Sequence, residues 1–141
     1  VKHLGTVTLE TDRLVLRQFQ TQDIPLAYKN WTSDGQMVAY LTWPVHKSVE
    51  VTEEVIQNWM ENYKDPSFYQ WSIVLKETQD PIGAISVVDQ GEDMVHIGYC
   101  LGSPWWNRGL RTEALREVVR FFFEDVKINR VESLRTRPFQ T

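Results

Sequence analysis

The sequence predicts one α/β domain, built on a mixed, mostly antiparallel sheet with helices on both faces. Three observations lead to this fold class. Strand-like segments and helix-like segments follow one another in the order β-α-α-β-β-β-α-β. The linkers between the three central strands are too short for a crossover, so these strands should form an antiparallel meander. The chain of 141 residues suits a single domain, residues 1–141, with one core.

The N-terminal part of the chain carries the first strand and the first helix. Residues 7–19 alternate as a strand does, and Thr11-Asp12 interrupts them as a turn or bulge. Thr21 is a suitable N-cap for a helix with Pro25 in its first turn, where the missing N–H does little harm. Apolar residues then follow at helical spacing: Ile24, Ala27, Tyr28 and Trp31.

An irregular, aromatic segment, residues 36–47, separates the first two helices. Its aromatic side chains either anchor a loop to the core or form a wall of a substrate site, since loops often carry binding residues. Ser48 is a suitable N-cap for the second helix. The buried stripe of that helix is predicted to comprise Val55, Ile56, Trp59, Met60 and Tyr63.

Four strands and one helix are predicted in the second half of the chain. The meander consists of residues 68–76, 82–89 and 94–101, and in the first of these strands larger apolar residues alternate with Ser72 and Val74. A helix over residues 108–125 and a last strand over 129–135 follow. A strand–helix–strand unit implies a right-handed crossover, which makes the last two strands parallel.

The segment that opens the third helix carries the clearest chemistry. It reads Ser103-Pro104-Trp105-Trp106-Asn107-Arg108-Gly109-Leu110-Arg111-Thr112-Glu113-Ala114-Leu115. The first N–H groups of a helix have no partner inside it, and the helix dipole places partial positive charge there. Gly109 lets a ligand approach the main chain closely, and Arg108 and Arg111 add charged donors suited to phosphate. The segment therefore indicates a phosphate or pyrophosphate site, with plain helix capping as the alternative.

The run from Trp106 to Leu115 resembles the acyl-CoA loop of the GCN5-related N-acetyltransferase (GNAT) family, in its ribosomal-protein-alanine acetyltransferase-like (RimJ/RimL-type) branch. Residues 9–17 are similar to the first strand of that branch, and Pro81-Ile82-Gly83 and Ile97-Gly98-Tyr99 fit its third and fourth strands. The similarities keep the family's order along most of the chain. One departure lies in the loop, where the family usually has Gly or Ala and this chain has Arg111.

The resemblance implies acetyl-CoA as co-substrate, held where the fourth and fifth strands of the family splay apart. It places the pantetheine arm against main-chain groups of Tyr99, Cys100 and Leu101. It places the pyrophosphate on the loop, so the other cofactor-binding residues are expected to be Trp106, Asn107, Arg108, Gly109, Leu110, Arg111 and Thr112. Glu113 is interpreted as a charge that the helix dipole favours, with no catalytic part.

The implied reaction is attack of a neutral amine on the acetyl thioester, which needs a proton acceptor and an oxyanion donor. His96 is the first candidate base, because an unperturbed imidazole has a pKa near ~6.5, and the alternative is an ordinary strand histidine. Tyr99 is the second catalytic candidate. Cys100 is interpreted as a small buried hydrophobe and not as a nucleophile. His46 and Glu10 are further titratable groups without a geometric argument.

Composition argues against several classes of protein. A net charge of -4 and a pI of about 5.4 disfavour nucleic-acid binding, which needs a basic surface. No His, Cys or Asp cluster has metal-ligand spacing, so no metal is expected. No apolar run approaches the roughly 20 residues that a membrane helix needs. Neither a membrane contact nor a signal segment is predicted, and the cytoplasm is the expected location.

The end of the chain departs from the family. Members continue past the fifth strand into a fourth helix and two more strands, whereas this chain ends with residues 135–141, including Pro138, a poor central-strand residue. The domain is therefore expected to be shortened at its C-terminal end, either naturally or by a sequence lesion. An unpaired edge on the last strand predicts self-association, in the simplest case as a dimer.

Together these features predict an N-acetyltransferase that moves an acetyl group from acetyl-CoA to a primary amine by direct attack in a ternary complex. The amine is either a protein N-terminus or a small molecule. A catalytically impaired CoA-binding or self-associating module is the alternative. A nucleotide-binding α/β domain is disfavoured, because the chain has neither a full phosphate-loop motif nor a dinucleotide glycine fingerprint.

Overall fold

The computed structural model describes residues 1–35 and 45–133. Six strands form one sheet in which every strand neighbours the next one in the sequence. The strands are Leu9–Glu10 (β1), Leu14–Arg17 (β2), Gln70–Leu75 (β3), Asp80–Gly91 (β4), Met94–Leu101 (β5) and Arg130–Ser133 (β6). Pairing is antiparallel from β1 to β5 and parallel between β5 and β6. The predicted mixed sheet, its antiparallel meander and its parallel last strand are confirmed.

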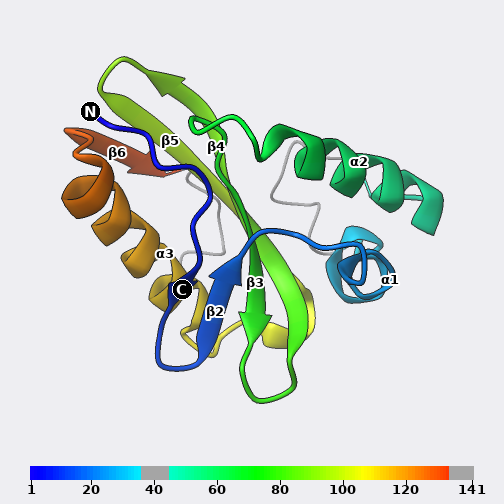
Figure 1. The fold of residues 1–141 in the computed structure, drawn as a ribbon. Helices are drawn as coiled ribbons and strands as arrows, with labels where there is room; N and C mark the ends of the chain where they lie inside the picture. The colour runs from blue at the N-terminus through cyan, green and yellow to red at the C-terminus, as the bar shows by residue number, and fades with distance from the viewer. Residues whose placement is uncertain (36–44, 134–141) are drawn as a thin grey trace.

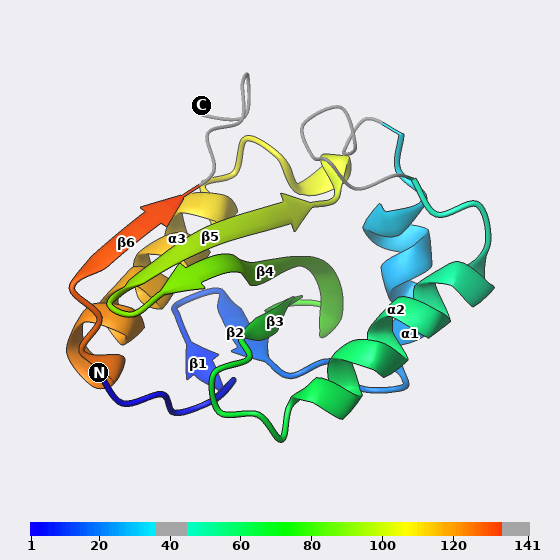
Figure 2. The ribbon, with the colours of Figure 1, turned by 90° about the horizontal axis from the view of Figure 1, so that it is seen from above.

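Helices cover both faces of the sheet, as Figures 1 and 2 show. On one face lie α1 (Asp23–Ala27), a π-helical turn at Tyr28–Thr32 and α2 (Val49–Asn62). On the other face lies α3 (Leu110–Phe121), which continues into a second π-helical turn at Phe122–Val126. Each face has its own apolar cluster, so the sheet forms the middle layer of a three-layer domain.

The structure corrects three predicted elements. The predicted turn at Thr11-Asp12 is confirmed, but it divides the predicted first strand into the two strands of a hairpin, in which the N–H of Thr11 donates to the carbonyl of Leu14. The first helix begins at Asp23 and not after a Thr21 cap. The third helix begins at Leu110, two residues later than predicted. The predicted segments 36–44 and 134–141, which include Pro138, lie outside the described residues.

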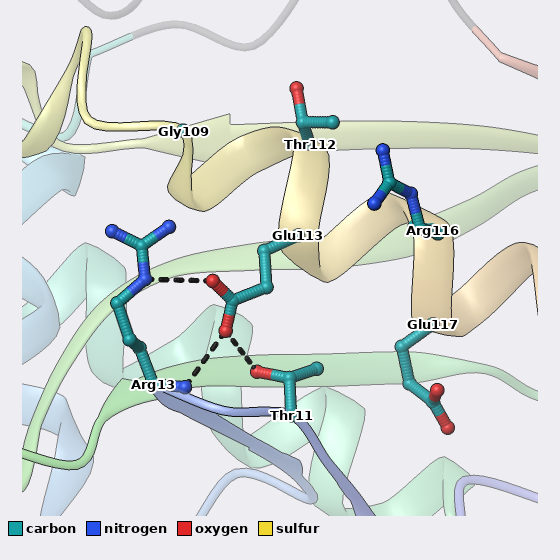
Figure 3. A pocket seen from close by; sticks show the side chains of 7 residues that line it. All are labelled: Thr11, Arg13, Gly109, Thr112, Glu113, Arg116 and Glu117. Carbon is teal, nitrogen blue, oxygen red and sulfur yellow. Dashed lines mark hydrogen bonds and ion pairs between the residues drawn. The ribbon is translucent and has the colours of Figure 1, made fainter.

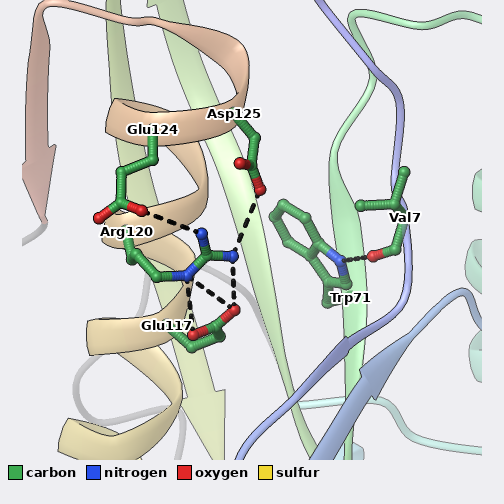
Figure 4. Close-up of polar contacts among 6 residues, drawn as sticks. All are labelled: Val7, Trp71, Glu117, Arg120, Glu124 and Asp125. Atoms are coloured by element: carbon green, nitrogen blue, oxygen red, sulfur yellow. Dashed lines mark hydrogen bonds and ion pairs between the residues drawn. The ribbon is translucent and has the colours of Figure 1, made fainter.

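The core on the α3 side is aromatic. Tyr69 and Trp71 of the β3 region meet Phe121 and Phe122 edge-on, with ring centroids 4.8 to 6.1 Å apart. The indole N–H of Trp71 donates to the Val7 carbonyl at 2.7 Å, so even this buried ring has its polar atom satisfied (Figure 4). On the outer surface of α3 and of the π-helical turn that follows it, three carboxylates surround the guanidinium of Arg120. They belong to Glu117, Glu124 and Asp125 (Figure 4).

The core on the α1/α2 side is built differently. Phe19, Trp31 and Ile56 provide its larger side chains, and the sheet contributes small residues such as Ala84 and Cys100. Because both faces are covered, all six residues of β3 are buried, including Ser72 and Val74 of its predicted alternation. No helix in residues 1–35 or 45–133 is long and apolar enough to cross a membrane.

Candidate functional site

The link between β5 and α3 is held tightly against the α1 side of the molecule. A Cβ on Gly102 would lie 2.2 Å from the carbonyl oxygen of Asn30, so only glycine permits this close approach. Residues Ser103–Trp105 then form a 3-10 turn. The N–H of Ser103 donates to a carboxylate oxygen of Asp34 at 2.9 Å. These contacts fix where the chain turns from strand to helix.

The first turn of α3 has the geometry of an anion site. Asn107 and Gly109 have φ values of 63° and 78°, and these two left-handed residues turn the chain from the loop into the helix. The first helical hydrogen bond runs from the N–H of Glu113 to the carbonyl of Gly109 at 3.1 Å. The N–H groups of residues 110–112 therefore have no carbonyl acceptor inside the helix, and Gly109 supplies no side-chain cap. Partial positive charge gathers at this point, as the sequence predicted.

A carboxylate clamp joins this turn to the β1–β2 hairpin (Figure 3). Glu113 accepts the hydroxyl of Thr11 at 2.5 Å, the N–H of Arg13 at 2.8 Å and the Nε–H of Arg13 at 2.7 Å. Arg13 also donates to the carbonyl of Arg108 at 3.0 Å. Partial burial acts to raise the pKa of Glu113, but the hydrogen bonds from Thr11 and Arg13 outweigh it and lower that pKa. Glu113 is thus a structural brace, and its hairpin partners were not identified from the sequence.

A cavity of about 540 Å³ lies beside this clamp. The side chains of Arg13 and Arg116 line it together with the carboxylates of Glu113 and Glu117, and Gly109 lies at the start of α3 (Figure 3). An anion on the first turn of α3 would therefore have two cationic side chains near it, of which Arg13 is already paired with Glu113. Neither Arg13 nor Arg116 was among the predicted site residues, because nothing local in the sequence ties Arg13 to the loop.

Two of the predicted loop arginines behave differently. Arg108 is exposed at the turn. Arg111 lies back toward β5, where its NH1 group donates to the hydroxyl of Tyr99 at 3.2 Å and its guanidinium carbon lies 5.6 Å from the centre of that ring. Arg111 therefore contacts β5 from the first turn of α3, in the place where the family usually has a small residue.

The main chain of β5 presents different residues to its two edges. The N–H of Gly102 donates to the carbonyl of Ile82 in β4 at 2.9 Å. Because main-chain groups alternate along an antiparallel strand, those of Cys100 also face β4, whereas those of Tyr99 and Leu101 face the edge toward β6. The described pairing with β6 ends at Ile97, so β5 continues for four residues beyond it. Of the three expected main-chain contacts, the geometry brings Tyr99 and Leu101 to this edge and turns Cys100 away.

The side chains of the predicted catalytic residues lie on opposite faces of β5. Tyr99 packs in the core on the α3 side and is only 5% exposed. His96 and Cys100 have the opposite parity and face the α1/α2 side, where His96 is half-buried. Burial raises the pKa of the Cys100 thiol to about 12, which leaves it protonated. The structure therefore does not bring the imidazole of His96 and the phenol of Tyr99 into one site.

A second, larger cavity of about 760 Å³ opens on the α1/α2 side. It is lined by Trp31, Thr32, Val45, His46, Lys47, Val51, Val55, Trp59, Phe68, Gln70, Ser86, Val87 and Val88. His46 has a defined place here: its Nδ1 is 2.8 Å from the hydroxyl of Thr52, which is 2.7 Å from the hydroxyl of Thr32. Burial lowers the pKa of His46 and so favours the neutral imidazole. Sequence reasoning named His46 but had no geometric argument for it.

The other titratable candidates lie elsewhere. Glu10 is exposed and pairs with Lys76 at 2.6 Å, which lowers the pKa of Glu10 through a hydrogen bond and charge attraction. Among the described residues, no group of three His, Cys, Asp or Glu side chains is placed to hold a metal ion.

Comparisons with known proteins agree with this architecture. The acetyltransferase (GNAT) domain family matches residues 13–136, which include β5, the loop and α3. The uncharacterized N-acetyltransferase p20 of Bacillus licheniformis is 29% identical over 128 residues, 89% of this chain and 71% of that relative.

Two solved structures share the fold. RimL, a ribosomal L7/L12 alpha-N-protein acetyltransferase in its apo form, has a TM-score of 0.76 and 17% identity over 88% of this chain and 68% of its own. The microcin C7 self-immunity acetyltransferase MccE, in complex with acetyl-CoA and AMP, has a TM-score of 0.70 and 17% identity over 84% of this chain and 66% of its own.

Proposed function

The chain belongs to the GNAT acetyltransferase family, and we propose that it transfers the acetyl group of acetyl-CoA to a primary amine within a ternary complex. The family uses acetyl-CoA as acetyl donor, and MccE was solved with that molecule bound. The name of RimL supports an α-amine as one kind of acceptor. The amine forms the new C–N bond, the C–S bond of the thioester breaks, and the proton lost by nitrogen ends on the released thiolate.

The observation that carries this proposal is the uncapped first turn of α3 directly behind Gly109. A diphosphate is an anion that needs close approach to several N–H groups, and this turn offers both the donors and a residue without a side chain. We assign the diphosphate to the loop from Trp106 to Thr112. Arg13 and Arg116 extend this seat beyond the residues that the sequence predicted.

The pantetheine arm is assigned to the edge of β5 that faces β6. Tyr99 and Leu101 turn their main-chain groups to this edge, which supports a contact like that of a neighbouring strand. An N–H group of this edge is the proposed donor to the developing oxyanion, because a fixed main-chain dipole needs no reorganisation during reaction. In this assignment the main chain of Tyr99 contacts the pantetheine arm, and the hydroxyl of Tyr99 keeps its hydrogen bond with Arg111.

His96 is the proposed proton acceptor. Its side chain lies on the sheet face that also borders the larger cavity, and a neutral imidazole nitrogen there can accept a proton from an attacking amine. His46 is the competing candidate, because it lines that cavity directly and its partner Thr52 fixes the ring. Replacing each histidine by glutamine separates the two candidates. The variant that lacks the true base is expected to lose the acid limb of its pH–rate profile.

Two measurements test the function itself. Calorimetry with acetyl-CoA, and with ATP as a negative control, is expected to show binding of acetyl-CoA only. Thiol release from acetyl-CoA over a panel of amines is expected to exceed the release without an amine. Binding without thiol release would identify a CoA-binding module instead of an enzyme, and no binding of acetyl-CoA would refute the proposal.

We also propose that the protein self-associates through β6. In the described residues the sheet ends with this strand, and an exposed strand edge is a template for pairing with another chain. Light scattering at working concentration is expected to give at least twice the mass of 16.6 kDa. A monomeric mass would contradict this proposal without affecting the catalytic one.

A further inference from the structure

The larger cavity lies between α2 and the sheet and has two contrasting sides. The helix side consists of Val51, Val55 and Trp59, and Trp31 adds a second indole. The sheet side contains Gln70 of β3 and Ser86 of β4, which are directly opposite each other in the antiparallel register. An apolar wall therefore faces a pair of neighbouring polar side chains.

One polar atom of each of these two side chains lacks a hydrogen-bond partner among the described residues. The Nε2 atom of Gln70 and the Oγ atom of Ser86 are buried and have no hydrogen-bond partner within the described part of the chain. Both residues are more than nine-tenths buried, at 3% and 4% exposure. A buried polar atom without a partner costs free energy. Each of these atoms has less than 1 Å² of accessible surface, so it reaches a ligand in the cavity only after its side chain rotates, and the hydrogen bond gained favours that rotation. An amide N–H donor beside a hydroxyl suits a ligand carbonyl.

The charges around the cavity limit the ligand further. None of its described lining residues is acidic, and residues 36–44, which precede Val45 in the sequence, include no Asp or Glu. Lys47 is its one permanently charged lining residue among those described. A ligand with several ammonium groups would meet no compensating carboxylate and one like charge.

The same surroundings favour the reactive form of an amine. Apolar walls and the absence of a carboxylate in the described lining destabilise an ammonium ion relative to the free amine. Attack on a thioester requires the free amine, so this environment favours the form of the ligand that can react. The volume of about 760 Å³ lies in the range of small-molecule sites. A longer peptide would have to bring further peptide groups past apolar walls, at a cost in desolvation.

We propose that this cavity is the acceptor site and that its ligand is a small-molecule primary monoamine with a large apolar group and a carbonyl that contacts Gln70 and Ser86. The inference rests on the proposed acetyl transfer, since it names the acceptor class of that reaction. Polyamines and polypeptide N-termini are the excluded classes.

Binding is measured first without acetyl-CoA, on the full chain, by calorimetry and by tryptophan fluorescence, because Trp31 and Trp59 line the cavity. The probes are L-phenylalaninamide, spermidine and a pentapeptide that begins with phenylalanine. L-Phenylalaninamide is expected to bind at least tenfold more tightly than either of the others. Tighter binding of spermidine or of the pentapeptide would overturn the assignment.

Two serine variants form a matched pair. Ser86→Ala is expected to weaken binding of L-phenylalaninamide about fivefold, the loss that one neutral hydrogen bond gives. Ser72→Ala is the control, because Ser72 is also fully buried, its hydroxyl has no partner in residues 1–35 and 45–133, and it does not line the cavity. Equal affinities for the two variants would overturn the role of Ser86.

A charge change at the rim provides an independent test. Val51 is 40% exposed on α2, so Val51→Glu should leave the fold intact and raise the affinity for spermidine severalfold, while Val51→Lys should not. A parallel titration with acetyl-CoA separates the two proposals. A protein that binds acetyl-CoA and acetylates spermidine but not L-phenylalaninamide keeps its proposed function and overturns this inference.

Discussion

Replacing Gly109 by alanine tests the diphosphate seat against a control that the chain itself provides. Gly109 and Gly5 have the same φ of +78°, and an added Cβ would meet its nearest atom at 3.5 Å and 3.7 Å respectively. Both distances are ordinary van der Waals contacts, so the cost in each case is that of an L residue in a left-handed conformation, about 1 to 2 kcal/mol. For a chain of this length such a loss lowers the Tm by about 2 to 8 °C.

The two variants should differ in affinity for acetyl-CoA. In Gly109→Ala the methyl group stands at the start of α3, where it holds the diphosphate away from the N–H groups of residues 110–112. Loss of one charge-assisted hydrogen bond, about 1.5 to 3 kcal/mol, weakens binding about tenfold to a hundredfold. Gly5→Ala should bind as the parent chain does, since Gly5 contacts Pro66 and not the loop. Circular dichroism melts and calorimetry give both numbers, and equal affinities for the two variants would refute the assigned seat.

Three further predictions concern single side chains. Glu113→Gln should lower the free energy of unfolding by about 1 to 2 kcal/mol at pH 7. The pKa of Glu113 is lowered in the folded state, so its stabilising effect is present above the unfolded-state pKa and is lost as the pH falls through the folded-state pKa. The urea midpoints of the variant and the parent protein should therefore converge below about pH 4. Cys100, with a pKa raised to about 12, should resist iodoacetamide in the native protein, and rapid labelling at pH 8 would contradict its burial. His96→Gln should flatten the acid limb of the pH–rate profile at unchanged affinity for acetyl-CoA, and an unaltered profile would make His96 an ordinary strand histidine.

The parts of the fold that sequence could predict are those with strong local periodicity. The bounds of β5, residues 94–101, agree with the prediction, because alternating apolar residues lie between a tight turn and Gly102. The loop and the start of α3 were identified to within two residues, since glycine and the amphipathic pattern are local signals. The predicted cap of the first helix failed for a tertiary reason. Asp23 pairs bidentately with Arg17 and accepts the N–H of Gln20, so this carboxylate organises the helix start in place of Thr21.

The parts of the site that sequence could not predict depend on contacts between distant residues. Thr11 and Glu113 are 102 positions apart, and neither position shows a pattern that would pair them. Gln70 and Ser86 become neighbours only through the register of β3 and β4. His46 acquires a partner through its contact with Thr52 on α2. In each case the sequence shows the residue, but its role depends on a second residue that only folding brings into contact with it.

Side-chain size explains why the larger cavity lies on the α1/α2 face of the sheet. On the α3 face, Tyr69, Trp71 and the phenylalanines of α3 fill the space between helix and strands. The opposite face of the same strands carries small residues in two neighbouring cross-strand rows. The first row is Ser72, Ala84 and Cys100, and the second is Ser86 and Gly98 with Gln70 as its β3 member. Ala84 and Cys100 of the first row pack with large side chains such as Phe19, whereas Gln70 and Ser86 of the second row border the cavity. The second row runs from β3 across β4 to β5, so it connects the wall of the cavity with the strand that carries the proposed pantetheine edge. Gly98 of β5 lies directly across from Ser86 in the register, so an acceptor held at Ser86 and an acetyl group held at β5 would lie on neighbouring strands.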